Sequence, residues 1–194
     1  KKAFEDISTK SNKYILKCFY YALKFAKRKV ISGIINCPIS KETLFKNNHQ
    51  GITEFISKKN KTKGKEVMLI YNKNLAVCPI TTHIPVNQIN KKINKNTIVK
   101  KIKTINNFYK NFFRKTPNIA ILGLNPHNFI PYKKKDSSKE VFLAIKSLKK
   151  SKIKVVGPIS PDSSFTNFKK NKYEVIVGMY HDQVLSPFKA LYKF

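Results

Sequence analysis

Residues 97–124 read TIVKKIKTINNFYKNFFRKTPNIAILGL and contain a helical pattern followed by a strand-like one. In residues 97–113, apolar side chains recur every three or four positions, which is the spacing of one face of an α-helix. In residues 119–124, apolar residues follow one another without a polar interruption, as they do in a strand that is buried on both faces. The stretch therefore predicts a helix that leads into a buried strand.

The same alternation of helical and strand-like patterns extends over the rest of the chain. Helical spacing is found at residues 14–25 and 139–149, and strand-like runs are found at residues 30–37, 67–71, 75–80, 154–156 and 174–179. Strands that alternate with helices predict an α/β fold with a mainly parallel or mixed sheet and helices on its faces. With six glycines, the chain has no GxGxxG or Walker loop, so any nucleotide must bind by another geometry.

The charge of the chain is strongly positive, with a formal net charge of +30. A basic protein raises the possibility of nucleic-acid binding, because Lys and Arg displace counterions from phosphates. Here only Arg28 and Arg114 are arginines, and the lysines are spread through every segment. Such a distribution favours a solvated lysine-rich surface. A basic RNA- or DNA-binding module stays as an alternative, supported by net charge alone.

Cysteine usage and hydropathy indicate an intracellular protein. Cys18, Cys37 and Cys78 lie in apolar runs without CxxC spacing, which predicts buried, reduced thiols. No apolar run approaches the roughly 18 residues that cross a bilayer, and the first residues lack a signal-peptide core. We therefore expect a soluble, cytoplasmic protein that does not bind membranes.

Three of the four histidines, His83, His127 and His181, directly follow predicted strands. In open α/β sheets, ligands bind at the carboxyl ends of the strands. Three imidazoles brought together there could hold one divalent cation and leave positions open for substrate oxygens. The spacing by itself does not distinguish such a site from unrelated surface or core histidines.

Six short segments carry a more specific signal. They are residues 37–42 (CPISKE), 51–54 (GITE), 81–85 (TTHIP), 123–127 (GLNPH), 157–165 (GPISPDSSF) and 179–183 (MYHDQ). In order and approximate spacing, these segments resemble the signature segments of the 4-hydroxythreonine-4-phosphate dehydrogenase family. The resemblance extends from about residue 10 to the C-terminus, and the Asn-Pro-His and Tyr-His-Asp-Gln segments are its most distinctive parts.

The resemblance implies a two-domain α/β sandwich of the isocitrate/isopropylmalate dehydrogenase-like type, here incomplete. Residues 1–50 and 182–194 would be remnants of the domain built from both chain ends. Residues 51–181 would be the central α/β domain, which carries the metal ligands and the dimer interface. The family's N-terminal segment with its Gly-Ile-Gly-Pro-Glu stretch, and the segment that follows Lys189 in the family, are not found in this sequence.

The resemblance also implies residue roles and cofactors. His83, His127 and His181 would bind a divalent metal, which could be Zn, Mg, Co or Mn, at an active site shared by the two subunits of a homodimer. Thr53 and Lys189 would bind the substrate. Lys189 and Asp162 would also be catalytic, although Asp162 could equally cap the helix that follows it. The cofactor would be NAD or NADP, and its binding residues are not identified.

The implied reaction is the NAD-dependent oxidation and decarboxylation of 4-phosphooxy-L-threonine to 3-amino-2-oxopropyl phosphate, in pyridoxine 5'-phosphate biosynthesis. Two departures from the family pattern bear on the substrate. Ile52 replaces the histidine of the family's Gly-His-Thr-Glu segment, with His49 nearby in sequence, and residues 128–135 are apolar and then basic. These departures leave open a related dehydrogenase acting on a threonate or erythronate phosphate, or a non-catalytic relative that keeps the metal site.

Overall fold

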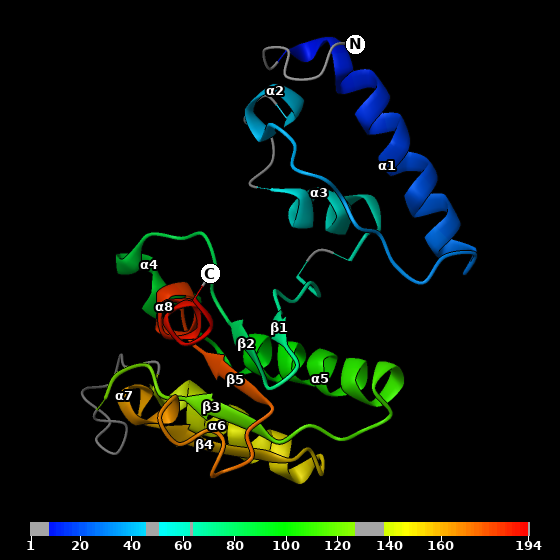
Figure 1. Ribbon diagram of the computed structural model, residues 1–194. Helices are drawn as coiled ribbons and strands as arrows, with labels where there is room; N and C mark the ends of the chain where they lie inside the picture. The colour runs from blue at the N-terminus through cyan, green and yellow to red at the C-terminus, as the bar shows by residue number, and fades with distance from the viewer. Residues whose placement is uncertain (1–7, 46–50, 63, 127–137, 194) are drawn as a thin grey trace. The chain divides into compact units, whose positions relative to one another are not determined.

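The computed structural model describes residues 8–45, 51–62, 64–126 and 138–193. The chain forms two compact units, Lys1–Glu66 and Val67–Phe194 (Figure 1). Residues 51–66 belong to the first unit, and residues 182–193 pack on the sheet of the second. The predicted domain boundaries, with one domain assembled from both chain ends, concern the whole protein and stay a prediction.

The second unit is built on a five-stranded sheet. Its strands are β1 (Ile70–Asn72), β2 (Leu75–Pro79), β3 (Ile119–Leu122), β4 (Val155–Ile159) and β5 (Val175–Gly178). Their order in the sheet is β1-β2-β5-β3-β4, in which β1 is antiparallel to β2 and the other neighbours are parallel. All residues of β2, β3 and β5 are buried, as the uninterrupted apolar runs in the sequence predict. The predicted α/β class with a mixed sheet is confirmed.

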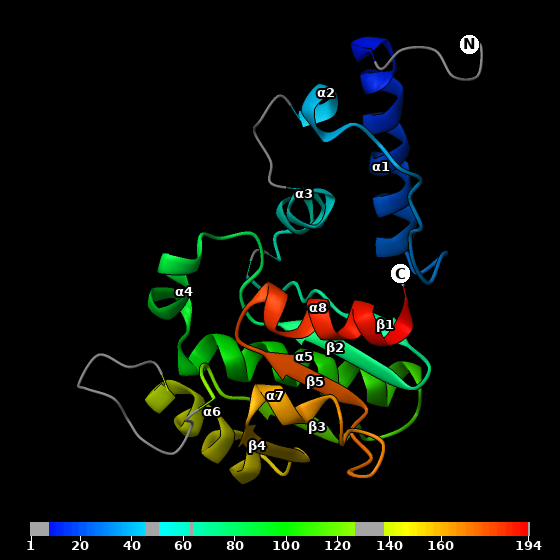
Figure 2. The same cartoon turned by 60° about the vertical axis from the view of Figure 1, so that its left-hand side comes forward.

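Helices cover both faces of this sheet, as Figures 1 and 2 show. They are α4 (Val86–Lys92), α5 (Lys95–Phe112), α6 (Ser138–Lys150), α7 (Pro161–Ser164) and α8 (His181–Tyr192). On one face, Cys78 of β2 belongs to a core that includes Ile102 of α5 and Ala144 of α6. On the other face, Val77 belongs to a core that includes Phe188 of α8. Neighbouring residues of a strand thus enter different cores, as the pleat requires.

The first unit is helical in its described part. It contains a 3₁₀ turn, η1 (Thr9–Ser11), and the helices α1 (Asn12–Lys27), α2 (Lys41–Phe45) and α3 (Ile52–Lys59). Phe19, Leu44, Phe45 and Phe55 form its core, with Phe55 in ring contact with both Phe19 and Phe45. No helix in the described part of either unit is long and apolar enough to cross a membrane.

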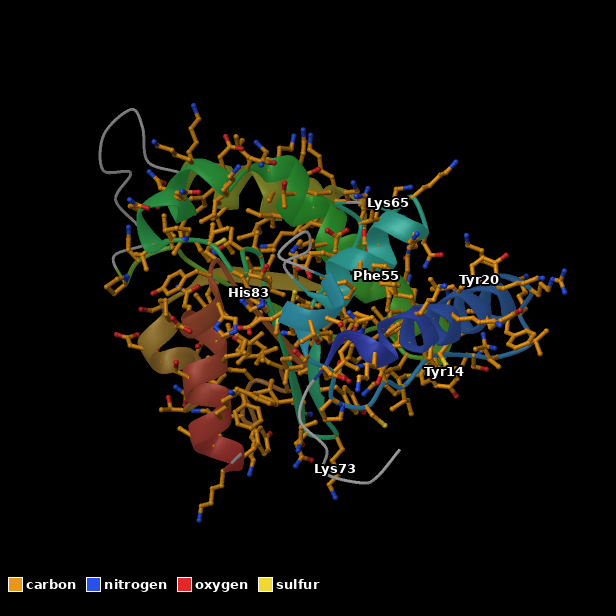
Figure 3. The ribbon with its side chains drawn as sticks, turned by 90° about the horizontal axis from the view of Figure 1, so that it is seen from above. Tyr14, Tyr20, Phe55, Lys65, Lys73 and His83 are labelled. Atoms are coloured by element: carbon orange, nitrogen blue, oxygen red, sulfur yellow. The ribbon has the colours of Figure 1, made fainter. Side chains whose placement is uncertain are left out.

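The strand predicted at residues 30–37 is wrong for this structure. Residues 33–40 carry no regular secondary structure, and the side chain of Ile35 is fully exposed. A β-strand needs a neighbouring strand to satisfy its N–H and C=O groups, and the described residues of the first unit contain none. The apolar run therefore forms no strand, and its residues are exposed or half-buried. Tyr14 and Tyr20 of α1 are also exposed (Figure 3).

The prediction of buried thiols is confirmed for one cysteine and wrong for two. All three cysteines are free, but only Cys78 is buried, whereas Cys18 and Cys37 are exposed. Burial raises the pKa of the Cys78 thiol to about 12, against a smaller lowering by the charge of Lys101. Cys37 is exposed because the apolar run in which it lies does not enter a sheet, and Cys18 because it lies on an exposed part of α1.

These exposures predict how the thiols of the 194-residue chain react with an aromatic disulfide reagent at neutral pH. Cys18 and Cys37 should react at once, and Cys78 should react only after denaturation, because it is inaccessible and almost wholly protonated. The absorbance of the released aromatic thiolate measures how many cysteine thiols have reacted. A Cys78→Ala variant should keep the two fast thiols and lose the slow one. A third fast thiol in the native chain would contradict the burial of Cys78.

Candidate metal centre

The four parallel strands end at one edge of the sheet, and each is followed by a segment that the sequence singled out. His83 follows β2, His181 follows β5, residues 123–126 follow β3, and Asp162 follows β4. Because the order is β2-β5-β3-β4, these segments occur in the same sequence along the edge. Main-chain hydrogen bonds join neighbouring strand ends, including Ile80 N–H to Gly178 O at 2.8 Å and Gly123 N–H to Ile159 O at 2.9 Å.

His83 and His181 come together from separate strands. Their ring centroids are 5.7 Å apart and their planes are inclined by 42°. His83 is exposed and the side chain of His181 is 31% exposed, so both rings are accessible from solvent. Figure 3 shows His83 beside the N-terminal end of α8, which begins with His181. Metal–nitrogen bonds are about 2.1 Å long, so the separation is compatible with one nitrogen of each ring on a common cation.

Asp182 fixes the orientation of one of these rings. Its Oδ1 lies 2.7 Å from Nδ1 of His181. When Nδ1 donates its proton to this carboxylate, the imidazole is held in the tautomer whose Nε2 keeps a free lone pair. Histidines that bind metals commonly donate their second nitrogen to a carboxylate in this way. The His181–Asp182 pair thus has the donor arrangement of a metal ligand, a role for Asp182 that sequence reasoning missed.

The third predicted ligand, His127, lies outside the described residues, as does His49. Within the described ranges, no group of three His, Cys, Asp or Glu side chains is close enough to hold a metal ion. The structure therefore places two of the three predicted ligands together. The Gly123-Leu124-Asn125-Pro126 segment that leads to His127 lies at the end of β3, next to β5 in the sheet.

Two buried polar residues beneath this edge, Thr81 and Gln183, were also missed. Both are 8% exposed, and both bond to main-chain atoms at the strand ends. Lys101 of α5 also bonds to the main chain here, because its Nζ donates a hydrogen bond to Ile80 O at 2.8 Å. The available sequence signal was the position of Thr81 two residues before one histidine and of Gln183 two residues after another.

Asp162 lies at the start of α7, at the end of β4. It is exposed, and a hydrogen bond from the Ser160 side chain is the main cause that lowers the pKa of its carboxyl group. Ser160 is the N-cap residue of α7, so Asp162 stands in the first turn and not at the cap position that was its alternative role. An ionised carboxylate is therefore available at this strand end at neutral pH.

Of the two predicted substrate-binding residues, Lys189 lies on the same helix as His181, and Thr53 lies on α3. Lys189 is exposed on α8, eight residues after His181 and so about 12 Å farther along the helix axis. Thr53 is exposed in the first turn of α3, in the first unit. Its neighbour Ile52, which replaces the family's histidine, packs against the phenylalanine core of that unit. Ile52 therefore has a packing role in this chain.

A hollow of about 1000 Å³ lies in the first unit, between α1, α2 and α3. Leu16, Tyr20 and Leu23 of α1 contribute to its apolar wall, and lysines of α1 and α3 line its margin. None of the described residues that line it is a His, Cys, Asp or Glu. Neither histidine of the pair is among the residues that line it.

Comparisons with known proteins identify the family to which the chain is similar. The family described as pyridoxal phosphate biosynthetic protein PdxA matches residues 2–193. The 4-hydroxythreonine-4-phosphate dehydrogenase of Aquifex aeolicus is 37% identical over 187 residues, which cover 95% of this chain and 58% of that protein. A protein of Oceanobacillus iheyensis provisionally named D-threonate 4-phosphate dehydrogenase is 29% identical over 97% of this chain and 58% of its own length.

A solved structure shows the same fold. The crystal structure of 4-hydroxythreonine-4-phosphate dehydrogenase from Klebsiella pneumoniae superposes with a TM-score of 0.84 at 27% identity, covering 96% of this chain and 58% of the other. The chain thus spans a little over half the length of the curated relatives that it matches. On the evidence of the family match and of these relatives, the chain belongs to the pyridoxal phosphate biosynthetic protein PdxA family.

Proposed function

We propose that the whole protein is a metal-dependent dehydrogenase that oxidises and decarboxylates 4-phosphooxy-L-threonine to 3-amino-2-oxopropyl phosphate. The names of its relatives support the reaction type and the substrate. The observation that carries the proposal within this chain is the placement of His83 and His181 side by side at the ends of adjacent parallel strands. That edge of a parallel sheet is where ligands bind.

The residues at this edge fit a divalent cation. His83 and His181 would hold it together with His127, and Asp182 would keep Nε2 of His181 directed to it. When bound, such an ion would supply a positive charge that stabilises negative charge developing on the substrate alcohol and ketone oxygens. NAD or NADP would accept the hydride. Zn, Mg, Co and Mn all remain candidates, because open positions next to imidazole suit each of them to some degree.

The remaining predicted residues have supporting roles in this proposal. Lys189 and Thr53 would bind the phosphate or carboxylate of the substrate, and Asp162 would place an ionised carboxylate near the reacting atoms. In the whole protein we propose two α/β domains of the isocitrate/isopropylmalate dehydrogenase-like type with the site between them. We further propose a homodimer that shares its active sites and works in the cytoplasm.

A threonate phosphate is a second candidate substrate, and Ile52 is the observation that favours it. An isoleucine at this position cannot donate a hydrogen bond or carry charge, and here it packs into the core of the first unit. A site that has lost a polar side chain should favour a substrate that lacks the group which that side chain would contact. The relative provisionally named D-threonate 4-phosphate dehydrogenase shows that this chemistry is assigned to a similar sequence.

The test is the formation of NADH or NADPH by the full-length protein with 4-phosphooxy-L-threonine and, separately, with D-threonate 4-phosphate. We expect turnover of the first substrate that a chelator abolishes and added divalent metal restores, because the cation stabilises the developing charge. Turnover of the threonate phosphate alone would identify it as the substrate and exclude 4-phosphooxy-L-threonine. Tight metal binding without turnover of either would identify a non-catalytic relative.

A further inference from the structure

We propose that Gln183 and Thr81 are positioning residues that hold the C-terminal ends of β2, β3 and β5 in register and thereby set the affinity of the metal centre. The inference rests on the proposed function. It concerns residues that do not themselves reach the cation. Both form hydrogen bonds that link the end of β5 to the ends of its two neighbours in the sheet, β2 and β3.

Gln183 joins the end of β5 to the end of β3. Its Oε1 accepts a hydrogen bond from Met179 N–H at 2.6 Å, and its Nε2 donates to Gly123 O at 2.8 Å. Met179 lies two residues before His181, and Gly123 lies four residues before His127. A single buried amide therefore connects the described ends of β3 and β5, which precede two of the predicted ligands in sequence. Both bonds are buried, so water does not compete for them.

Thr81 joins the end of β5 to the end of β2. Its Oγ1 donates to Met179 O at 2.7 Å, and its own N–H donates to the same oxygen at 3.1 Å. His83 follows two residues later. Met179 is thus the common partner, with its N–H bonded to Gln183 and its carbonyl oxygen bonded to Thr81. Through this peptide, side-chain hydrogen bonds connect the C-terminal ends of β2, β3 and β5.

The chemistry of the bridge is specific to an amide. One end of the Gln183 side chain must accept from an N–H and the other must donate to a C=O, and a primary amide does both without charge. A carboxylate of the same shape accepts from Met179 N–H but cannot donate to Gly123 O, and it places negative charge against that carbonyl oxygen. A methionine of similar volume makes neither bond, so it leaves two main-chain groups unsatisfied.

Gly178 makes the approach of this amide possible. A Cβ at position 178 would lie 2.9 Å from Oε1 of Gln183 and closer still to Cγ1 of Val184. Neither neighbour has room to withdraw, because Gln183 and Val184 are both buried in the first turn of α8. Three functions therefore lie within residues 178–183. Gly178 leaves space for the amide, Gln183 forms the two hydrogen bonds, and His181 is a predicted metal ligand.

The experiment compares metal affinity in the full-length protein and in its Gln183→Glu and Gln183→Met variants. Each protein is titrated with Zn²⁺ by calorimetry and with Co²⁺ by visible absorption, because the intensity and shape of the cobalt bands report the ligand geometry. We expect both variants to bind metal about 10- to 100-fold more weakly, the range found when groups that orient metal ligands are removed. The cobalt bands should also change shape.

Asn118→Asp is the matched control. Asn118 is also a buried amide, 9% exposed, and its Nδ2 donates to Asn171 O at 3.1 Å and Lys172 O at 3.2 Å. It lies at the opposite end of β3 from Gly123. The Asn118→Asp change should lower the melting temperature and leave the metal affinity and the cobalt spectrum unchanged. A loss of affinity in this control equal to that of the Gln183 variants would overturn the proposal, because it would reflect general destabilisation.

Substitutions of Thr81 give a second pair of variants, which should destabilise the fold less than the Gln183 variants do. Thr81→Val should weaken metal binding about tenfold, because it keeps the shape and the N–H bond but loses the Oγ1 bond, and Thr81→Ser should restore wild-type affinity. Wild-type affinity in Thr81→Val and in any folded Gln183 variant would overturn the positioning role and leave the proposed function intact. Absence of metal binding by the wild-type protein would overturn both.

Discussion

Alanine in place of His181 or His83 is expected to abolish tight divalent-metal binding by the full-length protein and to lower kcat/KM by about 10³-fold or more. The reason is that a metal ion at an oxyanion contributes several kcal/mol to the transition state, and about 4 kcal/mol corresponds to a thousandfold change in rate. The two rings lie 5.7 Å apart, so we expect them to serve the same ion. Calorimetric titration with Zn²⁺ and initial-rate measurements check the prediction.

The double variant His83→Ala/His181→Ala distinguishes a shared ion from two independent roles. If the rings bind one ion, the double variant should lose little more than either single variant, because groups that act as a unit are not additive. Asp182→Asn is the graded control, and we expect it to weaken metal binding by about 10- to 100-fold. Full additivity of the two histidine effects, or unchanged metal affinity in the single variants, would contradict the arrangement.

Gly157→Ala is expected to lower the free energy of unfolding of the second unit by about 2 to 5 kcal/mol. Gly157 has φ +146°, a conformation that residues with a Cβ rarely adopt. A Cβ there would also lie closer to the Ile121 carbonyl oxygen than real Cβ atoms approach. Because that oxygen belongs to the main chain of β3, it cannot move aside as a flexible side chain would. Urea unfolding followed by circular dichroism measures the loss.

Gly33→Ala is the matched control for this substitution. A Cβ at position 33 would meet no atom within 4 Å, and this glycine is not among those with positive φ. We therefore expect a change of less than about 0.5 kcal/mol. Equal stability of the Gly157→Ala and Gly33→Ala chains would show that β3 and β4 can separate at Gly157. That result would mean that the irregular register between Ala120 and Leu122 is not fixed by close contact at the glycine.

The helices and strands of the second unit could be predicted from the sequence because its apolar spacing matches the side chains that are buried in the structure. The apolar spacing of residues 97–113 coincides with α5 up to its last residue, Phe112, and the runs at 75–80 and 119–124 contain β2 and β3. The run at 30–37 has an equally strong pattern but forms no strand, because a strand requires a partner that a local pattern does not supply. For the same reason, Cys37 was predicted to be buried and is exposed.

The two histidines of the candidate site could be predicted from the sequence, but the buried residues that hold the strand ends around them could not. The convergence of His83 and His181 followed from their positions after strands, because strand ends of a parallel sheet meet at one edge. The order of strands, which makes these two histidines neighbours, was not available from spacing. The bridges made by Gln183 and Thr81 depend on that order, since they connect residues 60 and 98 positions apart in the chain.

The strand order also has a consequence for how the protein is synthesised. Of the five described strands, β5 is the last to leave the ribosome, yet it lies between β2 and β3. Until residues 175–178 emerge, β2 has only β1 as a neighbour and β3 has only β4, so each of these apolar strands lacks the parallel partner on its other side. Such intermediates are prone to aggregation, and the long sequence separation slows their completion. We expect the chain to depend on chaperones during this interval, and the histidine pair to form only when the central strand is inserted.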